Sequence, residues 1–489
     1  MTTEQQLPKG WKIERLGDVL QIQNGYAFKS IEFIKENPEN IHIPLIRQSQ
    51  LVGNIVDVSN CVFLNRKYLI DKQNYIVNKG DILIGMSGSI GKVSFYEEDY
   101  PALLNQRVGK LNLYDNDTFQ KDFFAYLLIS LESSIIQIAK GMGVQNISSK
   151  DIEQLKIPIP PLETQQAIVN KIESLFDEID EGIGRLKTAE QQIQQYRQSL
   201  LKNAFNGELT KEWRSKHEDT LPSENELLAQ IQTTREQHHA QQLADWQTAV
   251  SQWEQNGKEG KKPSKPKAPT QAVKFEENFA DLPNGWGWIR LGNLNLDIFD
   301  GPFGSNLKTK DYVDFGVRVI RLENIGYLKF ITDKYAFITN EKYSTIQKHS
   351  IYSGDLIFSS FITDGIRVAI VPDNIGKAVN KSDCFCLRVL DNTILNKFLA
   401  YFLSTRSAYK QAELQIHGVG RPRINTTQLK NINIPLCSLA EQTQIVAILE
   451  SKLTACDQLA AELAKQLKQA ELLKQAVLKA AFSGNLLDK

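Results

Sequence analysis

IPIPPLETQQAIVNKIESLFDEIDEGIGRLKTAEQQIQQYRQSLLKNAFNG, residues 157–207, is the stretch that decides the fold. After Pro160 and Pro161, apolar residues recur at alternating intervals of four and three from Ile168 to Leu200. This spacing is a heptad seam, which predicts a helix that packs against another helix along its length. A helix of about 40 residues would extend roughly 60 Å.

The same stretch occurs a second time near the other end of the chain. Residues 141–207 align without a gap with residues 418–484, each match being 277 positions apart. Two such helices cannot bury their seams alone, so we expect them to pair with each other as an antiparallel coiled coil. The predicted seam positions are Ile168, Ile172, Leu175, Ile179, Leu186, Ile193, Leu200, Ile445, Leu449, Cys456, Leu459, Leu463, Leu473 and Val477.

The repeat extends forward along the chain, but not evenly. Leu7-Pro8 and Gly10-Trp11 recur 275 positions later, as does Arg15-Leu16-Gly17, while Lys9 is replaced by Asn284. Lys79-Gly80-Asp81-Ile82-Leu83 resembles residues 353–357 at an offset of 274. Little else matches between these points. Each half therefore has a similar frame and a dissimilar centre. Either two similar platforms read two different targets, or the halves have drifted apart after a duplication.

The two arms, residues 7–161 and 282–436, read as α+β domains. Short strand patterns lie at 81–84 and 93–95 in the first arm, and at 317–321, 355–358 and 367–370 in the second. Residues 122–138 and 396–415 are predicted helices. Between the arms, Ser223 and Glu226 form a capping-box pattern that opens a Gln-rich helix, and residues 257–267 read as a basic, disordered linker.

Composition restricts the class of protein. The 489 residues carry no net charge, but residues 282–436 contain 19 Lys and Arg against 13 Asp and Glu. Overall neutrality therefore does not exclude DNA, because binding depends on the charge of one face. The five cysteines show no metal-binding spacing, so we expect reduced, buried thiols, no metal, and a cytoplasmic protein.

Several loops carry side chains suited to nucleic acid. Amides of Asn and Gln pair with adenine, Arg pairs with guanine, and Lys or backbone N–H groups contact phosphates. The loop at residues 87–92 fails the Walker pattern, so we expect no nucleotide there. The candidate DNA-binding residues are Lys29, Arg47, Ser89, Lys92, Asn105, Gln106, Arg107, Gln145, Asn146, Ser305, Lys308, Arg321, Asn324, Arg367, Lys381, Arg421 and Arg423.

These motifs together resemble one known family. A W-x-x-x-R-L-G element opens each arm, a G-D-I/L strand lies inside it, and I-P-x-x-x-L followed by a long helix closing on A-F-x-G ends it. This doubled pattern is similar to the specificity subunits of type I restriction-modification enzymes. The resemblance covers nearly the whole chain, and residues 210–281 are its least typical part.

The resemblance implies an architecture and a set of partners. Two target-recognition domains, 1–161 and 282–436, would each read half of a split DNA site, and helices 162–210 and 437–489 would hold them apart, with 211–281 as an insertion. The helices would bind two methylation subunits, which restriction subunits join. S-adenosylmethionine, ATP and Mg would sit on those partners, so we expect no cofactor and no catalytic residue in this chain.

Two alternatives stay open at this stage. A single-chain restriction and methylation enzyme would need catalytic motifs, and we find no [NDS]-P-P-[YFW], HExxH, P-loop or helicase motif. A coiled-coil scaffold that binds only protein would explain the helices but not two large, divergent arms.

Overall fold

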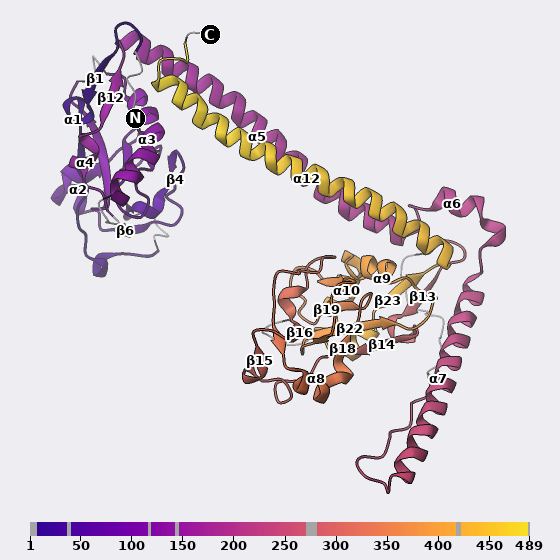
Figure 1. Ribbon diagram of the computed structural model, residues 1–489. Coiled ribbons are helices and arrows are strands. Elements are labelled where there is room, and N and C mark those ends of the chain that lie inside the picture. Colours follow the sequence, from indigo (N-terminus) through magenta and orange to yellow (C-terminus); the bar gives the residue numbers. More distant parts are fainter. Residues whose placement is uncertain are drawn as a thin grey trace. The chain divides into compact units, whose positions relative to one another are not determined.

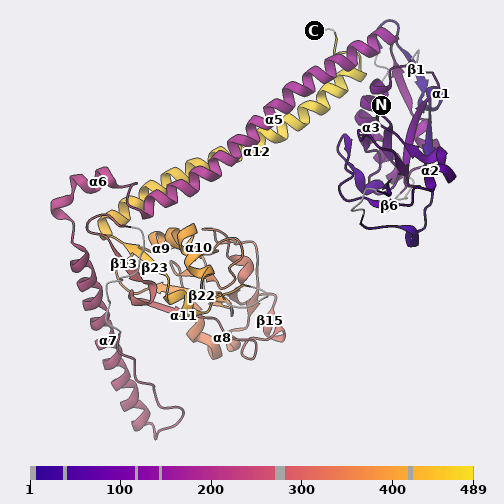
Figure 2. The same ribbon diagram turned by 180° about the vertical axis from the view of Figure 1, so that it is seen from behind.

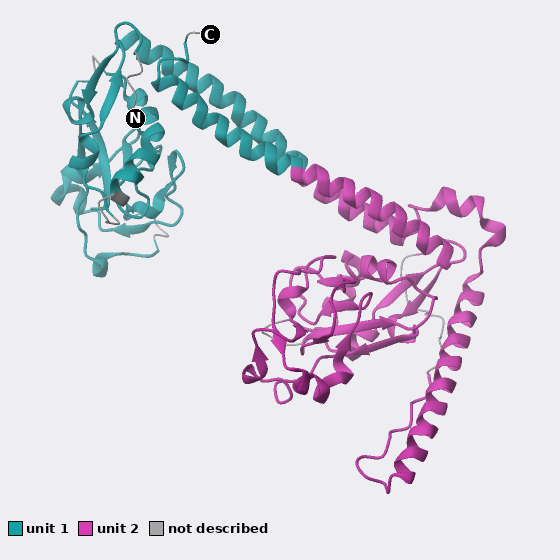
Figure 3. Ribbon diagram, in the orientation of Figure 1, with its two compact units in different colours: residues 1–189, 462–489 teal, residues 190–461 magenta. Residues whose placement is uncertain are grey.

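The computed structural model describes residues 7–36, 41–115, 119–141, 146–269, 281–416 and 422–487. The chain forms two compact units, shown in Figure 3: unit 1 is residues 1–189 with 462–489, and unit 2 is residues 190–461. Each unit contains one α+β domain and a segment of each of two long helices, α5 (Leu162–Phe205) and α12 (Leu439–Phe482). The predicted fold class is therefore confirmed.

The domain of unit 1 is built on small, mostly antiparallel sheets. Their strand orders are β1-β12, β6-β3-β10-β7 and β2-β11-β8-β9-β5-β4, with parallel pairs between β3 and β10 and between β5 and β9. The elements are β1 (Lys12–Arg15), α1 (Leu16–Val19), β2 (Leu20–Asn24), β3 (Ile43–Ile46), β4 (Leu51–Val52), β5 (Ile55–Val56), β6 (Val62–Leu64), α2 (Tyr68–Asp71), β7 (Ile76–Val77), β8 (Ile82–Gly85), β9 (Val93–Phe95), β10 (Ala102–Leu104), β11 (Val108–Leu113), α3 (Lys121–Gly141), α4 (Ser149–Glu153) and β12 (Lys156–Ile159).

The domain of unit 2 repeats this plan. Its strand orders are β13-β23, β14-β22-β19-β20 and β15-β17-β16-β21-β18, and β16 pairs with β21 in parallel as β3 does with β10. The elements are β13 (Gly287–Arg290), β14 (Leu296–Phe299), β15 (Tyr312–Val313), β16 (Val317–Ile320), β17 (Phe337–Ile338), α8 (Asn340–Ile346), β18 (Ser350–Ile351), β19 (Leu356–Ser359), β20 (Val368–Ile370), β21 (Ala378–Asn380), β22 (Cys384–Val389), α9 (Asn396–Leu403), α10 (Arg406–Glu413), α11 (Thr426–Lys430) and β23 (Asn433–Leu436).

The repeated motifs at the two ends of each domain pair with each other. In unit 1, Lys12 of β1 lies opposite Ile159 of β12, and in unit 2, Gly287 of β13 lies opposite Leu436 of β23. The chain thus enters and leaves each domain through one two-stranded ribbon. This pairing explains why these motifs recur while the centres differ, because they form the frame on which the variable part is mounted.

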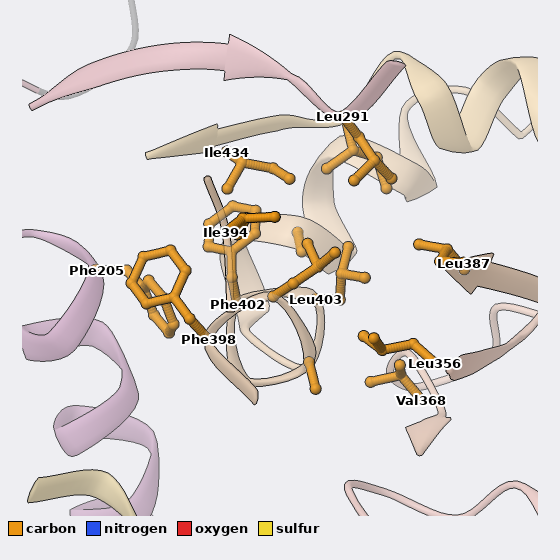
Figure 4. Close-up of a cluster of buried hydrophobic side chains, with 14 of the residues drawn as sticks. Phe205, Leu291, Leu356, Val368, Leu387, Ile394, Phe398, Phe402, Leu403 and Ile434 are labelled. Atoms are coloured by element: carbon orange, nitrogen blue, oxygen red, sulfur yellow. The ribbon is translucent and has the colours of Figure 1, made fainter. Parts of the chain in front are cut away.

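The end of each long helix is fixed in a domain by a phenylalanine. Phe205 of α5 packs edge-on against Phe398 and Phe402 of α9, with ring centroids 5.1 and 5.2 Å apart (Figure 4). In unit 1, Phe482 of α12 packs against Phe123 of α3 at 5.3 Å. The A-F-x-G motif therefore anchors each helix end to the core of a globular domain.

The glycine that ends this motif is required by close packing. Gly207 and Gly484 both have φ of +80°, a conformation that favours glycine. A Cβ atom on Gly207 would lie 2.2 Å from Cγ of Pro283, and one on Gly484 would lie 2.3 Å from Cγ of Pro8. The end of each helix thus lies against the Leu-Pro motif that opens a domain.

Within each unit, the segments of α5 and α12 pack against each other and run antiparallel (Figures 1 and 2). In unit 1, Asp180 of α5 pairs with Lys474 of α12 at 2.6 Å, and in unit 2, Arg197 pairs with Asp457 at 2.5 Å. The partner number falls as the residue number rises, as an antiparallel pair requires. Both helices have 44 residues, close to the predicted length.

The predicted seam is accurate on α5 and partly wrong on α12. Ile168, Ile172, Ile445 and Leu449 are buried, but Leu459 and Leu473 are 58% and 52% exposed. The half-buried positions on α12 are instead Leu453, Ala460, Leu467, Ala470 and Lys474, which together with the predicted Cys456, Leu463 and Val477 keep intervals of three and four. An offset of 277 from the α5 seam falls on Lys452 and Gln466, which were not predicted as seam residues. Both are exposed, and Leu453 and Leu467 beside them are half-buried, so no charge or amide is buried at these positions.

Most predicted elements of the arms are present. The helix predicted at 122–138 is α3, whose segment Lys121–Ala139 is, among the described residues, the one helix long and apolar enough to cross a membrane. Phe123, Phe124 and Leu127 on it lie in the core of unit 1. The single helix predicted at 396–415 is two helices, because Thr405 caps α10 by accepting the backbone N–H of Ala408.

The insertion between the domains carries a long helix. α6 (Lys211–Lys216) is followed by α7 (Glu224–Gln255), which begins at the predicted capping box of Ser223 and Glu226. Leu227, Ile231 and Arg235 of α7 are buried, and none of its later residues is. After this helix come residues 257–269, which include the stretch predicted to be disordered. Trp246 and Trp253 of α7 donate hydrogen bonds to the carbonyls of Pro263 and Gly260 in it.

Candidate nucleic-acid interface

Matching backbone hydrogen bonds define equivalent loop positions in the two domains. The N–H of Met86 donates to the carbonyl of Arg107 at 3.0 Å, and the N–H of Ser360 donates to the carbonyl of Asp383 at 2.9 Å. The carbonyl of Met86 accepts the N–H of Ile147 at 2.9 Å, and the carbonyl of Ser360 accepts the N–H of Ile424 at 3.0 Å. Arg107 in unit 1 and Asp383 in unit 2 thus occupy the same place in the frame.

Two further positions follow from a matching pair of bridges. Ser87 forms an isolated antiparallel bridge with Asn146, and Phe361 forms the corresponding bridge with Arg423. Both bridges bring the loop after a central strand, β8 or β19, against the segment that precedes the last short helix, α4 or α11. We call Ser87, Arg107 and Asn146 loop cluster 1, and Phe361, Asp383 and Arg423 loop cluster 2.

Loop cluster 1 surrounds a polar pocket. The pocket has a volume of about 400 Å³, and the side chains of Arg107 and Asn146 are exposed. The lining residues are Asn24, Met86, Ser87, Gln106, Arg107, Asn146, Ile147, Ser148 and Ser149. Amides, hydroxyls and one guanidinium are the groups that hydrogen-bond base edges.

Loop cluster 2 has a different chemistry in the same frame. Arg423 pairs with Asp383 at 3.6 Å, and Asp383 also accepts the Ser360 hydroxyl at 3.1 Å. Nearby, Asp300 accepts the backbone N–H groups of Gly301 and Asp383 at 2.7 and 3.0 Å, and burial raises the pKa of its carboxyl. A carboxylate accepts from cytosine N4, whereas Arg donates to guanine. Both clusters contain an arginine, but only loop cluster 2 contains a carboxylate, so the two clusters offer different groups to the bases.

One arginine is the same in both domains. Arg47 and Arg321 each precede a short 3-10 helix, and each donates its backbone N–H to the side chain three residues on, Gln50 or Asn324. The Nε atoms of both arginines are buried without a hydrogen-bond partner in the structure. A group that both domains share is suited to a feature common to both targets, such as the phosphate backbone.

The remaining predicted residues are scattered by the fold. Asn324 is 1% exposed and donates to the carbonyls of Ile331 and Lys334, so its amide stabilises the loop and is not free for a base. Asn105 is 8% exposed, and Ser89 donates to the carbonyl of Gln48. Gln145 and Arg421 lie outside the described residues. Gln106 lines the pocket of loop cluster 1. Exposed or half-buried elsewhere on the two domains are Lys29, Lys92, Ser305, Lys308, Arg367 and Lys381.

Sequence reasoning missed half of the equivalent positions. Ser87, Phe361, Asp383 and the pocket residue Asn24 were not predicted as site residues. The offset between repeats grows from 274 at Gly80 to 277 at Gly141, so alignment alone could place the partner of Arg107 only within residues 381–384. The backbone hydrogen bonds resolve this ambiguity. No group of three or more His, Cys, Asp or Glu suited to a metal occurs in the part of the chain that the structure describes.

Comparison with known proteins matches this architecture. The family model of the type I restriction modification DNA specificity domain matches residues 8–190 and again 306–469. The chain belongs to this family. The two matches correspond to the two halves of the repeat, so the family's domain is present twice.

Some relatives match this chain over nearly its whole length. The chain is 25% identical over 480 residues to the type I restriction enzyme EcoBI specificity subunit of Escherichia coli, covering 97% of this chain and 86% of the relative. It is 21% identical to the MjaVIII specificity subunit of Methanocaldococcus jannaschii, covering 98% and 94%. A chain from a solved structure described as "Structural basis underlying complex assembly and conformational transition of the type I R-M system" has a TM-score of 0.64, at 18% identity, and covers 98% of this chain and 100% of its own length. That likeness supports the same fold for both chains.

Proposed function

We propose that this chain is the DNA-recognition subunit of a type I restriction-modification complex, and that each globular domain reads one half of a bipartite DNA site. The observation that carries the proposal is the pair of loop clusters. The same backbone hydrogen bonds hold Ser87, Arg107 and Asn146 in one domain and Phe361, Asp383 and Arg423 in the other. Two domains that recognise different DNA sequences need the same backbone framework with different side chains at the base-contacting positions.

The chemistry of the clusters supports a division of labour within each domain. Arg107 and Asn146 present donors and acceptors for base edges, while Arg47 and Arg321 present the same group in both domains. Base contacts specify the sequence, and contacts to phosphate or sugar position the protein. The shared arginines would therefore position each domain, and the loop clusters would select the bases.

The proposed role assigns catalysis to other subunits. The helices α5 and α12 would bind two methylation subunits, and restriction subunits would join them in the cytoplasm. S-adenosylmethionine, ATP and Mg would act on those partners, and this chain would hold no cofactor. A protein-only scaffold gives no reason for polar, side-chain-exchanged clusters at equivalent loops of two domains. The purified chain alone should therefore show no nuclease, methyltransferase or ATPase turnover.

The test is the sequence of methylated adenines in cells that express the chain with its cognate methylation subunits. Arg107→Ala should relax one half-site and Asp383→Ala the other, each by roughly 1–3 kcal/mol of discrimination if the contact is to a base. Each variant is the control for the other, because the half-site read by the unaltered domain should stay unchanged. If either substitution changes both half-sites equally, the two-reader proposal is wrong.

A further inference from the structure

We infer that the basic segment beside helix α7 is a second DNA-contacting surface, which binds the phosphate backbone outside the sequence-reading loops. The segment, residues 257–269, is called the strap here. This inference rests on the proposed function, because it needs DNA held by the domains. It concerns a part of the chain that neither loop cluster includes and that neither family match covers, since the matches end at residue 190 and resume at 306.

The strap is attached to the helix by two tryptophans. Trp246 and Trp253 lie seven residues apart on α7 and so share one helix face. Their indole N–H groups donate to the carbonyls of Pro263 and Gly260, at 3.0 and 3.3 Å. These bonds hold the strap along the helix instead of leaving it as a free tether.

The same two tryptophans also contact lysine side chains of the strap. The ammonium of Lys262 lies 5.9 Å from the ring centroid of Trp253, and that of Lys265 lies 5.8 Å from that of Trp246. The strap contains one acidic residue, Glu259, against five lysines, all exposed: Lys258, Lys261, Lys262, Lys265 and Lys267. A row of five ammonium groups over ten residues is complementary to a polyanion.

The helix carries this row away from the domain surface. The first three turns of α7 are anchored, since Leu227 and Ile231 are buried and Ile231 belongs to the core of unit 2. The part from Glu236 to Gln255 has no buried residue and would extend about 30 Å at 1.5 Å per residue. An arm of this length can reach phosphates that the loops of its own domain do not contact.

DNA fits the strap better than a protein partner does. Stable protein interfaces are centred on aromatic and aliphatic side chains, with charged groups at their rim. The strap offers only Gly, Lys, Glu, Pro, Ser and Ala, and the two tryptophans near it already bond to its own carbonyls. Lysines as point charges on a backbone stiffened by proline suit phosphates without selecting a base.

The experiment measures how DNA affinity depends on salt, using the chain assembled with its methylation subunits. The variant Lys258→Gln/Lys261→Gln/Lys267→Gln removes three charges and leaves both lysine–tryptophan contacts in place. The matched control replaces the same lysines by Arg, which keeps the charge. Each complex is titrated with a duplex containing the methylated motif and with a duplex of equal length lacking it.

The Gln variant should bind both duplexes more weakly by the same factor, roughly fivefold for each lost phosphate contact near 0.15 M salt. The slope of log affinity against log salt should become shallower by about 0.9 for each lost contact. The Arg control should behave as the unaltered complex, and the methylated motif should not change. The motif readout tests the proposed function separately from the strap.

Three results would overturn the inference. An unchanged salt slope in the Gln variant would show that the strap lysines do not contact phosphate. A loss confined to the motif-containing duplex would show that they read bases. Loss of the methylation subunits on size-exclusion chromatography, with the salt slope of the remaining complex unchanged, would assign the strap to a protein partner.

Discussion

A buried carboxylate of unit 2 gives the sharpest stability prediction. Glu441 of α12 is 1% exposed and accepts three hydrogen bonds, from Thr210 at 2.7 Å, Arg214 at 2.6 Å and Trp286 at 2.8 Å. It thus joins the long helix to the start of the insertion and to the tryptophan that opens the second domain. The Arg214 side chain is itself only 14% exposed.

Glu441→Ala should lower the free energy of unfolding of unit 2 by about 3–5 kcal/mol. Removing one partner of a buried ion pair leaves the other charge uncompensated, and this is the larger part of the cost. Thr210 and Trp286 also lose an acceptor. A double variant, Glu441→Leu with Arg214→Met, should cost less than Glu441→Ala, because it leaves no unpaired charge in the site.

Urea denaturation followed by tryptophan fluorescence measures this effect. Five of the six tryptophans, including Trp286, lie in residues 190–461, so the signal reports mainly on unit 2. The control is Glu450→Ala on the same helix, which removes an exposed ion pair with Lys397 and should cost less than about 1 kcal/mol. If Glu441→Ala costs no more than Glu450→Ala, the buried network does not stabilise the unit and the reasoning is wrong.

Three further predictions concern the long helices and the thiols. Gly182→Ala with Gly184→Ala should stabilise unit 1 by roughly 0.5–1 kcal/mol per site, because neither new Cβ meets an atom within 4 Å, and thermal unfolding would measure it; a lower melting temperature would reveal a need for glycine there. Matched insertions of seven residues near Ala189 and Gln466 keep the heptad frame and add about 10 Å of helix, so the gap in the methylated motif should grow by about three base pairs. An active variant with the original gap would show that the helices do not set the spacing. All five cysteines are buried, and burial raises the pKa of Cys61 to about 12, so a thiol reagent at pH 8 should label the native protein slowly and the denatured protein at five sites; rapid native labelling would contradict their placement.

The two long helices could be predicted from the sequence because their apolar pattern is periodic and occurs twice. The heptad spacing from Ile168 to Leu200 identified α5, and the offset of 277 located α12. The same offset wrongly placed Leu459 and Leu473 in the seam, because seam positions transferred from α5 take no account of which side chains of α12 can be buried. On α12, Lys452 and Gln466 are exposed, and the apolar residues beside them, Leu453 and Leu467, are half-buried.

The loop clusters were accessible only in part. Arg107, Asn146 and Arg423 were predicted because amides and guanidinium groups in loops suit base edges. Asp383 and Phe361 were not predicted, because an acidic or aromatic side chain is not a usual sign of DNA contact. Asn324 was wrongly predicted to contact DNA. Its side chain is polar, but its amide donates hydrogen bonds to the carbonyls of Ile331 and Lys334 and is not free for a base. Which amides are free depends on backbone geometry, which no residue pattern specifies.

The division of the chain between the two units sets an order for folding during synthesis. Unit 2 is one continuous segment, residues 190–461, and its core can close as soon as that segment has left the ribosome. Unit 1 needs residues made before and after that segment, since Val477, Leu478, Ala481 and Phe482 complete the core around α3. The first domain to be translated must therefore wait, with part of its apolar surface uncovered, for the last helix to arrive.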